Sequence, residues 1–293
     1  MAHKPTRVVE AYSLHGFEEP GTSLQALVDY DALFTGIVGS AHHALQFTIG
    51  SDVVAITDRE KTGKTLALHF VTGNPGELPL IFDEDSGTTL LGDPGHGRFV
   101  VRDAWVFAIP RRRLLFLEKK RPGVLTSQIE QFLSRFTREQ MACQWVSISL
   151  NPVASPAFSD EIQRFTRIRT ASVTLRRPNP SWGSDYAALL GAIADSDAGD
   201  ISLQANAERG QTLARNRGII SMLQQMSSTV VSGIKKAVVR GTMPGFAGEK
   251  TVYLSKNTVR GSTQVTPDAD IRTALAEVVD TLAEQIDERD DEH

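Results

Sequence analysis

Residues 52–72, DVVAITDREKTGKTLALHFVT, consist of two apolar runs separated by a polar turn. Asp52–Thr57 and Thr65–Thr72 have the composition and length of β-strands. Lys61–Lys64 between them contains a glycine, which is typical of a hairpin connection. This stretch therefore predicts an antiparallel hairpin.

The remainder of the first half is also predicted to be rich in strands. Gly97–Ile109 and Arg113–Glu118 are expected to form a second strand pair, joined through Pro110 and three arginines. Helices are expected over Thr22–Phe34, capped by Thr22 or Ser23, and over Leu125–Gln140. Further strands are expected at Arg7–Leu14 and Leu45–Ile49, and the second helix is expected to bury Ile129, Phe132, Leu133 and Phe136.

The second half alternates between strands and helices. Strands are predicted at Gln144–Leu150, Ile168–Arg176, Asp200–Ala205, Lys236–Arg240 and Thr251–Leu254, and helices at Phe158–Phe165, Ser184–Ala194, Ile219–Ser232 and Pro267–Asp287. We therefore expect a two-domain α+β fold, with a β-rich domain over 1–143 and a mixed α/β domain over 144–293. The last helix has an apolar stripe that suits packing on its own domain or on a second subunit, namely Ile271, Leu275, Val278, Leu282 and Ile286.

The cysteine content and the apolar segments indicate a cytoplasmic protein. Cys143 is the one cysteine, so no intrachain disulfide can form. No apolar run approaches the roughly 20 residues that a membrane-spanning helix needs.

Charge is strongly segregated along the chain, although the net charge is only −4. Residues 98–177 contain 15 lysines and arginines against 6 acids, and residues 209–260 contain 9 against one. Acids dominate residues 1–97 and the final 26 residues. Such basic blocks predict a surface for a polyanion, provided that they meet in the folded protein.

The basic blocks contain no helix-turn-helix, zinc finger or aromatic stacking platform. We therefore predict contacts with the DNA backbone that lack sequence preference. The predicted contacts are Arg111, Arg112, Arg113, Lys119, Lys120, Arg121, Arg167, Arg169, Arg176, Arg177, Arg209, Arg215, Arg217, Lys235, Lys236, Arg240, Lys256 and Arg260.

The sequence does not match the phosphate-binding loop or the metal-binding motifs that we compared with it. Lys61–Thr65, KTGKT, is similar to the end of a phosphate-binding loop, but Asp58 stands where that loop needs a glycine. A strand also follows it, whereas a phosphate loop opens a helix. The adjacent His42 and His43 cannot chelate one metal from a strand. We therefore expect no cofactor, no metal and no catalytic residue.

A metal-dependent nuclease is the enzymatic alternative. Asp103 lies on one predicted strand, and Glu118 and Lys120 have the acid–x–Lys spacing on the next. Two such acids hold a divalent metal in restriction-type nucleases, and the lysine orients a water molecule.

The loop Gly241–Gly248 has Phe246 at its centre, within the second basic block. An apolar tip among cations suits insertion into a DNA groove. An ordinary hairpin loop fits the same residues equally well.

The segment Asp200–Gly210, DISLQANAERG, resembles a stretch of the RexA exclusion proteins of temperate phages. Val173–Pro178, VTLRRP, resembles the basic strand end that precedes it in that family, and His42–Gln46, HHALQ, resembles a third place near the N-terminus.

The resemblance implies a cytoplasmic homodimer that binds DNA non-specifically, with a two-domain α+β fold related to the recombination-associated protein RdgC. It also implies a role in prophage-encoded exclusion of other phages, beside a RexB-like membrane protein. It supports Arg176, Arg177 and Asp200–Gly210 as contact positions. Ser184–Asp195, however, lacks the lysines and arginines of the corresponding family helix. A non-enzymatic protein that signals to a membrane partner is the other alternative.

Overall fold

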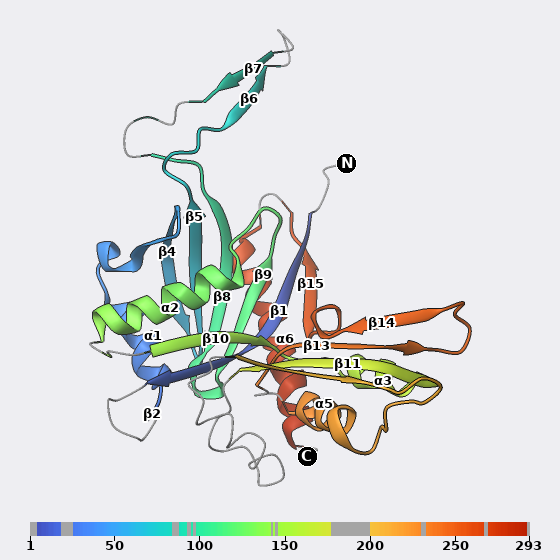
Figure 1. Ribbon diagram of the computed structural model, residues 1–293. Coiled ribbons are helices and arrows are strands. Elements are labelled where there is room, and N and C mark those ends of the chain that lie inside the picture. Colours follow the sequence, from blue (N-terminus) through green and yellow to red (C-terminus); the bar gives the residue numbers. More distant parts are fainter. Residues whose placement is uncertain are drawn as a thin grey trace. The chain divides into compact units, whose positions relative to one another are not determined.

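The computed structural model describes residues 5–18, 26–83, 88–92, 95, 98–141, 143, 146–176, 200–229, 233–266 and 269–291 (Figure 1). The fold is of the predicted α+β class. The chain forms two compact units. Unit 1 comprises Met1–Val9, Gly16–Ile148 and Ser262–Val279, and unit 2 comprises Glu10–His15, Ser149–Gly261 and Asp280–His293.

Each unit is thus assembled from three segments, whereas the sequence led us to expect two contiguous halves. The long elements at the two ends of the chain explain the difference, because each contributes residues to both units. These elements are β1, Thr6–Glu18, and α6, Ile271–Asp291. A break at residue 143 between independently folding domains stays a prediction.

The largest sheet has nine strands in the order β10-β1-β9-β8-β5-β4-β3, with β2 and β15 also paired to β1. β6 and β7 form a separate two-stranded sheet. The strands are β2 Ala26–Leu27, β3 Gln46–Ile49, β4 Asp52–Thr62, β5 Thr65–Gly73, β6 Leu80–Asp83, β7 Thr88–Leu91, β8 Arg102–Ile109, β9 Leu114–Lys119, β10 Val146–Pro152 and β15 Arg260–Gln264.

Both predicted strand pairs of the first half are confirmed. β4 and β5 pair antiparallel, and Gly63 at the first position of their two-residue connection has a φ of 59°. A glycine at this position is typical of a type II′ hairpin turn. β8 and β9 also pair antiparallel, and the 3-10 helix η2, Pro110–Arg112, connects them. Arg113 ends this connection in the left-handed region, with a φ of 53°.

The core of unit 1 lies between the sheet and helix α2, Thr126–Gln140. Ile129, Phe132, Leu133 and Phe136 of α2 are fully buried, as predicted. The ring of Phe132 meets the rings of Phe47 and Phe70 edge-on, with centroids 5.0 and 5.1 Å apart. This aromatic contact fixes α2 on the face of β3 and β5.

Phe132→Ala is expected to lower the free energy of unfolding by about 3–5 kcal/mol, because it leaves a cavity between α2 and the sheet. Urea denaturation measures the loss. Leu125→Ala is the control, because Leu125 is 61% exposed and should change stability little. A Phe132→Ala protein as stable as the control would contradict this packing.

Helix α1 begins later than the sequence predicts, at Tyr30, and it ends at Gly39. The predicted start was wrong because Asp29, and neither Thr22 nor Ser23, caps the helix. The Asp29 carboxylate accepts a hydrogen bond from the Ala32 amide at 3.0 Å. Ala26 and Leu27 pair with β1 as a short strand, and residues 19–25 lie outside the described part of the chain.

Helix α6 also begins later than predicted, and Thr266 is not its cap. The side chain of Asp270 accepts from the Arg272 amide at 3.1 Å and from the Thr273 hydroxyl at 2.7 Å. The buried stripe of α6 contains Leu275, Val279, Leu282, Ala283 and Ile286, so Val279 replaces the predicted Val278. Pro267 and Asp268 lie outside the described residues.

Unit 2 has a four-stranded antiparallel sheet with the order β12-β11-β13-β14. The strands are β11 Arg167–Arg176, β12 Asp200–Asn206, β13 Ile234–Thr242 and β14 Glu249–Tyr253, and the helices are α3 Pro156–Gln163 and α5 Gly218–Ser228. The predicted helix Ser184–Ala194 lies outside the described residues. Two further 3-10 helices are η1, His42–Leu45, in unit 1 and η3, Leu254–Lys256, in unit 2.

The core of unit 2 lies between this sheet and the two helices. Phe158 and Ile162 of α3, Leu223 of α5, and Val173 and Val239 of the sheet are buried in one cluster. No helix in the described part of the chain has the length and apolar character needed to cross a bilayer.

Candidate nucleic-acid interface

The pairing of β11 with β13 joins the two basic blocks of the sequence. β11 belongs to the first block and β13 to the second, and they pair antiparallel with Thr170 opposite Arg240. The two blocks therefore meet within unit 2, although 57 residues separate Arg176 from Ile234 in the sequence.

The sheet of unit 2 has one covered and one open face. Ala171, Val173 and Leu175 alternate along β11 and are buried in the core with α3 and α5. Figure 1 shows both helices on the same side of β11 and β13. The residues between the buried ones, Ser172 and Thr174, therefore face away from the helices.

Most side chains on the open face are polar or cationic. Its members in register across the sheet are Ser202, Gln204 and Asn206 of β12, Thr170, Ser172 and Thr174 of β11, Lys236, Val238 and Arg240 of β13, and Thr251 and Tyr253 of β14. The Thr174 and Ser202 hydroxyls lie 3.0 Å apart. Hydroxyl, amide and cationic groups are the side chains that contact phosphate and sugar in protein–DNA complexes.

Two arginines on this sheet form ion pairs with the same carboxylate. Glu249 accepts from Arg169 at 2.7 Å and from Arg240 at 2.6 Å. The two arginine side chains stay 59% and 55% exposed. The hydrogen bond from Arg169 holds the pKa of Glu249 below its usual value, and Arg240 adds to this effect. The group has one positive charge more than its acid neutralises.

The loop between β13 and β14 contains an exposed phenylalanine next to Lys250, which pairs with Glu161 of α3 at 3.2 Å. Phe246, in the loop between β13 and β14, is 53% exposed, and the Lys250 ammonium lies 5.0 Å from its ring centroid. Met243 is buried and anchors the loop. Gly245 and Gly248 have φ values of 78° and 95°, which favour glycine. Phe246 is thus at an accessible tip, and its insertion into a groove stays a prediction.

The other predicted cations of unit 2 differ in their contacts. Arg167 donates to the Gln211 carbonyl at 2.7 Å, Arg215 to the Gln163 carbonyl at 3.2 Å, and Lys235 to Asp200 at 2.7 Å. The Lys256 ammonium lies 5.2 Å from the Tyr253 ring centroid. Arg209, Arg217 and Arg260 are exposed. The side chain of Arg176, and Arg177 as a whole, lie outside the described residues.

The remaining predicted cations lie in unit 1, at the two ends of β9. Arg111, Arg112 and Arg113 precede the strand, and Lys119, Lys120 and Arg121 end or follow it. Arg111 pairs with Asp31 at 3.3 Å, and Lys120 pairs with Asp103 at 2.5 Å. The predicted positive surface is therefore divided between the two units.

Asp103 and Glu118 lie on the neighbouring strands β8 and β9, as predicted, and Lys120 follows β9, but both carboxylates have protein partners. Glu118 is buried and accepts from Arg7 at 2.6 Å and from the Trp105 amide at 3.1 Å. Asp103 binds Lys120 and also contacts His69 Nε2 at 3.2 Å. Within the described residues, no cluster of three or more histidines, cysteines and acids is arranged to hold a metal.

The Asp103 ion pairs predict a pH-dependent contribution to stability. Burial alone would raise the pKa of Asp103, but the hydrogen bonds from Lys120 and His69 outweigh it and lower the pKa. Stability from this group is therefore present above the unfolded-state value of about 3.9, and it is lost as the pH falls through the lower folded-state value.

Asp103→Asn is expected to lower the free energy of unfolding by about 1 kcal/mol or less near pH 7, since solvent screens this half-exposed cluster. The difference from wild type should vanish in acid, where both proteins lack the charge. Urea titrations at a series of pH values measure it, with the exposed Asp58→Asn as control. A constant difference down to acid pH would contradict the ion-pair explanation.

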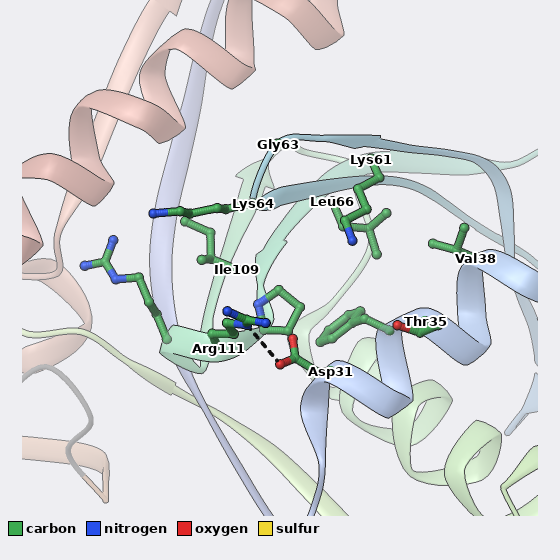
Figure 2. A pocket seen from close by; sticks show the side chains of 12 residues that line it. Asp31, Thr35, Val38, Lys61, Gly63, Lys64, Leu66, Ile109 and Arg111 are labelled. Carbon is green, nitrogen blue, oxygen red and sulfur yellow. Dashed lines mark hydrogen bonds and ion pairs between the residues drawn. The ribbon is translucent and has the colours of Figure 1, made fainter.

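A second concentration of positive charge surrounds a pocket in unit 1 (Figure 2). It is lined by Lys61, Gly63 and Lys64 at the β4–β5 turn, by Pro110, Arg111 and Arg112 of η2, by Asp31, Phe34, Thr35 and Val38 of α1, and by Leu66 and Ile109. The lysine pair was not predicted as part of a site. Pairing of Leu66 with Ala108 brings this turn beside η2, a long-range contact without a local sequence signal.

Residues 104–229 match a family model described as "Domain of unknown function (DUF4747)". The matched region begins in β8 and ends just after α5, so it includes Arg111–Arg121, β11 and β12. It does not include Lys61, Lys64 or β13. A search of curated proteins finds no match.

Proposed function

We propose that the protein binds duplex DNA without sequence preference, through the open sheet face of unit 2. The observation that supports this most directly is the Arg169–Glu249–Arg240 group, in which two exposed guanidinium groups share one carboxylate. A guanidinium group can donate two parallel hydrogen bonds to phosphate oxygens. The exposed ion pair with Glu249 is too weak to prevent this contact.

The neighbouring residues of the open face fit the same ligand. Lys236 adds a cation, and the hydroxyl and amide side chains of β11 and β12 supply donors for phosphate oxygens. Phe246, in the loop that follows β13, provides an exposed apolar tip that can press between base pairs in the minor groove. None of these residues offers the paired donors and acceptors of a base-reading helix, so sequence preference is not expected.

Arg169→Gln combined with Arg240→Gln is expected to weaken DNA binding and to lower the salt slope by about 2, because each lost phosphate contact removes roughly 0.9 from the slope. Glu249→Gln should strengthen binding by roughly twofold to fivefold, since both arginines lose their competing partner. Fluorescence anisotropy with a labelled duplex over a range of salt concentrations measures both effects.

The matched control is Arg138→Gln, an exposed arginine on α2 in unit 1. It should leave affinity and salt slope unchanged. Absence of any retarded complex at low salt and micromolar protein would reject DNA binding. It would favour the non-enzymatic protein that signals to a membrane partner.

The nuclease alternative has a separate test. Asp103 of β8 contacts Lys120, which follows β9, but the Glu118 carboxylate already accepts hydrogen bonds from Arg7 and the Trp105 amide. Supercoiled plasmid incubated with the protein and Mg²⁺ is therefore expected to stay intact. If the protein cleaves the plasmid and Asp103→Asn abolishes this cleavage, the nuclease alternative replaces our proposal.

We further propose that the protein forms a homodimer in the cytoplasm. Leu78, Leu91, Val100 and Val101, which lie in the segment around β6 and β7, are exposed apolar side chains of unit 1. The two-stranded sheet also has backbone edges that a second copy can pair with. Its place in phage exclusion, beside a RexB-like membrane protein, rests on the resemblance to RexA.

Leu91→Glu is expected to shift the protein from dimer to monomer. Leu91 is 67% exposed in the single chain, and a charge at this position would be buried in the proposed dimer interface. Light scattering coupled to size-exclusion chromatography measures the mass. Glu284→Gln, at an exposed site on α6, is the control. A wild-type protein that elutes as a monomer at all concentrations would exclude the dimer.

A further inference from the structure

The pocket of unit 1 is large enough for a small organic ligand. Its volume is about 640 Å³, within the range of small-molecule sites. Three elements form its wall: helix α1, the β4–β5 turn and η2. Figure 2 shows Lys61 pointing from the hairpin toward α1, and Arg111 on the opposite side beside Asp31.

The pocket lining is strongly cationic. Lys61, Lys64, Arg111 and Arg112 line it, and Asp31 is the one acid among its lining residues. Asp31 contacts Arg111 at 3.3 Å, and both side chains are largely exposed. Neither lysine has an acidic partner among the residues that the structure describes. The lining therefore has an excess of three positive charges, which favours a ligand with several negative charges.

The floor of the pocket is apolar. Phe34, Leu66 and Ile109 are buried beneath it, and Val38 at its side is partly exposed. In Figure 2, Ile109 lies next to Lys64, and Leu66 lies next to Lys61. A simple inorganic anion would leave this carbon surface in contact with water. The lining instead suits a ligand with an anionic end and a flat or apolar body.

We propose that this pocket binds a phosphorylated nucleoside. Its phosphates contact the arginines of η2 and the lysines of the hairpin turn, because planar guanidinium forks match phosphate oxygens. Its base packs on Val38 and Pro110 over the apolar floor. The same chemistry is available from a free nucleotide and from the 5′-phosphorylated end of a nucleic-acid strand.

The mode of binding differs from that of a phosphate-binding loop. The KTGKT turn connects two strands, so it supplies lysine side chains and no helix N-terminus. Asp31 contacts Arg111 at 3.3 Å, and the phosphates would replace this carboxylate. The site lies in unit 1, and it does not depend on the DNA interface proposed for unit 2.

Isothermal titration calorimetry with ADP, adenosine and pyrophosphate tests the proposal on the full-length protein. ADP is expected to bind, adenosine to show no detectable binding, and pyrophosphate to bind about tenfold more weakly than ADP, since it lacks the base. Lys64→Gln with Arg111→Gln should weaken ADP binding by about tenfold or more. Asp31→Asn should strengthen it.

Two variants serve as controls, and circular dichroism shows whether each variant is folded. Arg138→Gln and the Arg169→Gln, Arg240→Gln double variant should leave ADP affinity unchanged, which separates this site from DNA binding. Comparison of 5′-phosphorylated with 5′-hydroxyl oligonucleotides then distinguishes a strand end from a free nucleotide. If the protein binds the 5′-phosphorylated oligonucleotide selectively, and this binding requires Lys64 and Arg111, the ligand is a strand end.

The proposal is overturned by any of three results. If the Lys64→Gln, Arg111→Gln variant binds ADP as tightly as wild type, the pocket is not the ADP-binding site. Equal binding of ADP and pyrophosphate would exclude recognition of the nucleoside. Tighter binding of an acidic peptide than of ADP would identify a protein segment as the ligand.

Discussion

The antiparallel pairing of β11 with β13 determines the chemistry of unit 2. This register sets Thr170 opposite Arg240 and Thr174 opposite Lys236, so residues from distant parts of the sequence share one face. Side chains alternate along each strand, and the helices bury only the other face. Ser172, Thr174, Lys236 and Arg240 therefore face away from the helices together. The Thr174–Ser202 hydroxyl pair and the position of Arg240 depend on this arrangement.

Both cationic regions contain a carboxylate that is easily replaced. Glu249 binds two arginines in unit 2, and Asp31 binds Arg111 in unit 1. Exposed ion pairs contribute little to stability, because water solvates both partners and side-chain entropy opposes the contact. A phosphate group has more charge and more acceptor oxygens than one carboxylate. In the binding modes that we propose, it would displace Glu249 or Asp31 at small cost.

The sequence predicted the elements whose signals are local. Alternation and turn residues identified the β4–β5 and β8–β9 hairpins, and the apolar spacing of α2 identified its four buried side chains. The predicted starts of α1 and α6 were wrong, because several nearby residues can cap a helix, and the local cap bonds are made by Asp29 and Asp270. The sequence also predicted Arg169 and Arg240 as DNA contacts, but it did not show that both pair with Glu249. The pocket was not predicted, because it requires β5 to pair with β8.

The division of β1 and α6 between the two units has a consequence for biosynthesis. Unit 1 begins at the N-terminus but needs Ser262–Val279, and unit 2 needs Glu10–His15. A ribosome must therefore release nearly the whole chain before the first unit has all its segments. Folding of this protein is expected to be largely post-translational, and a fragment cut within the chain would leave both units incomplete.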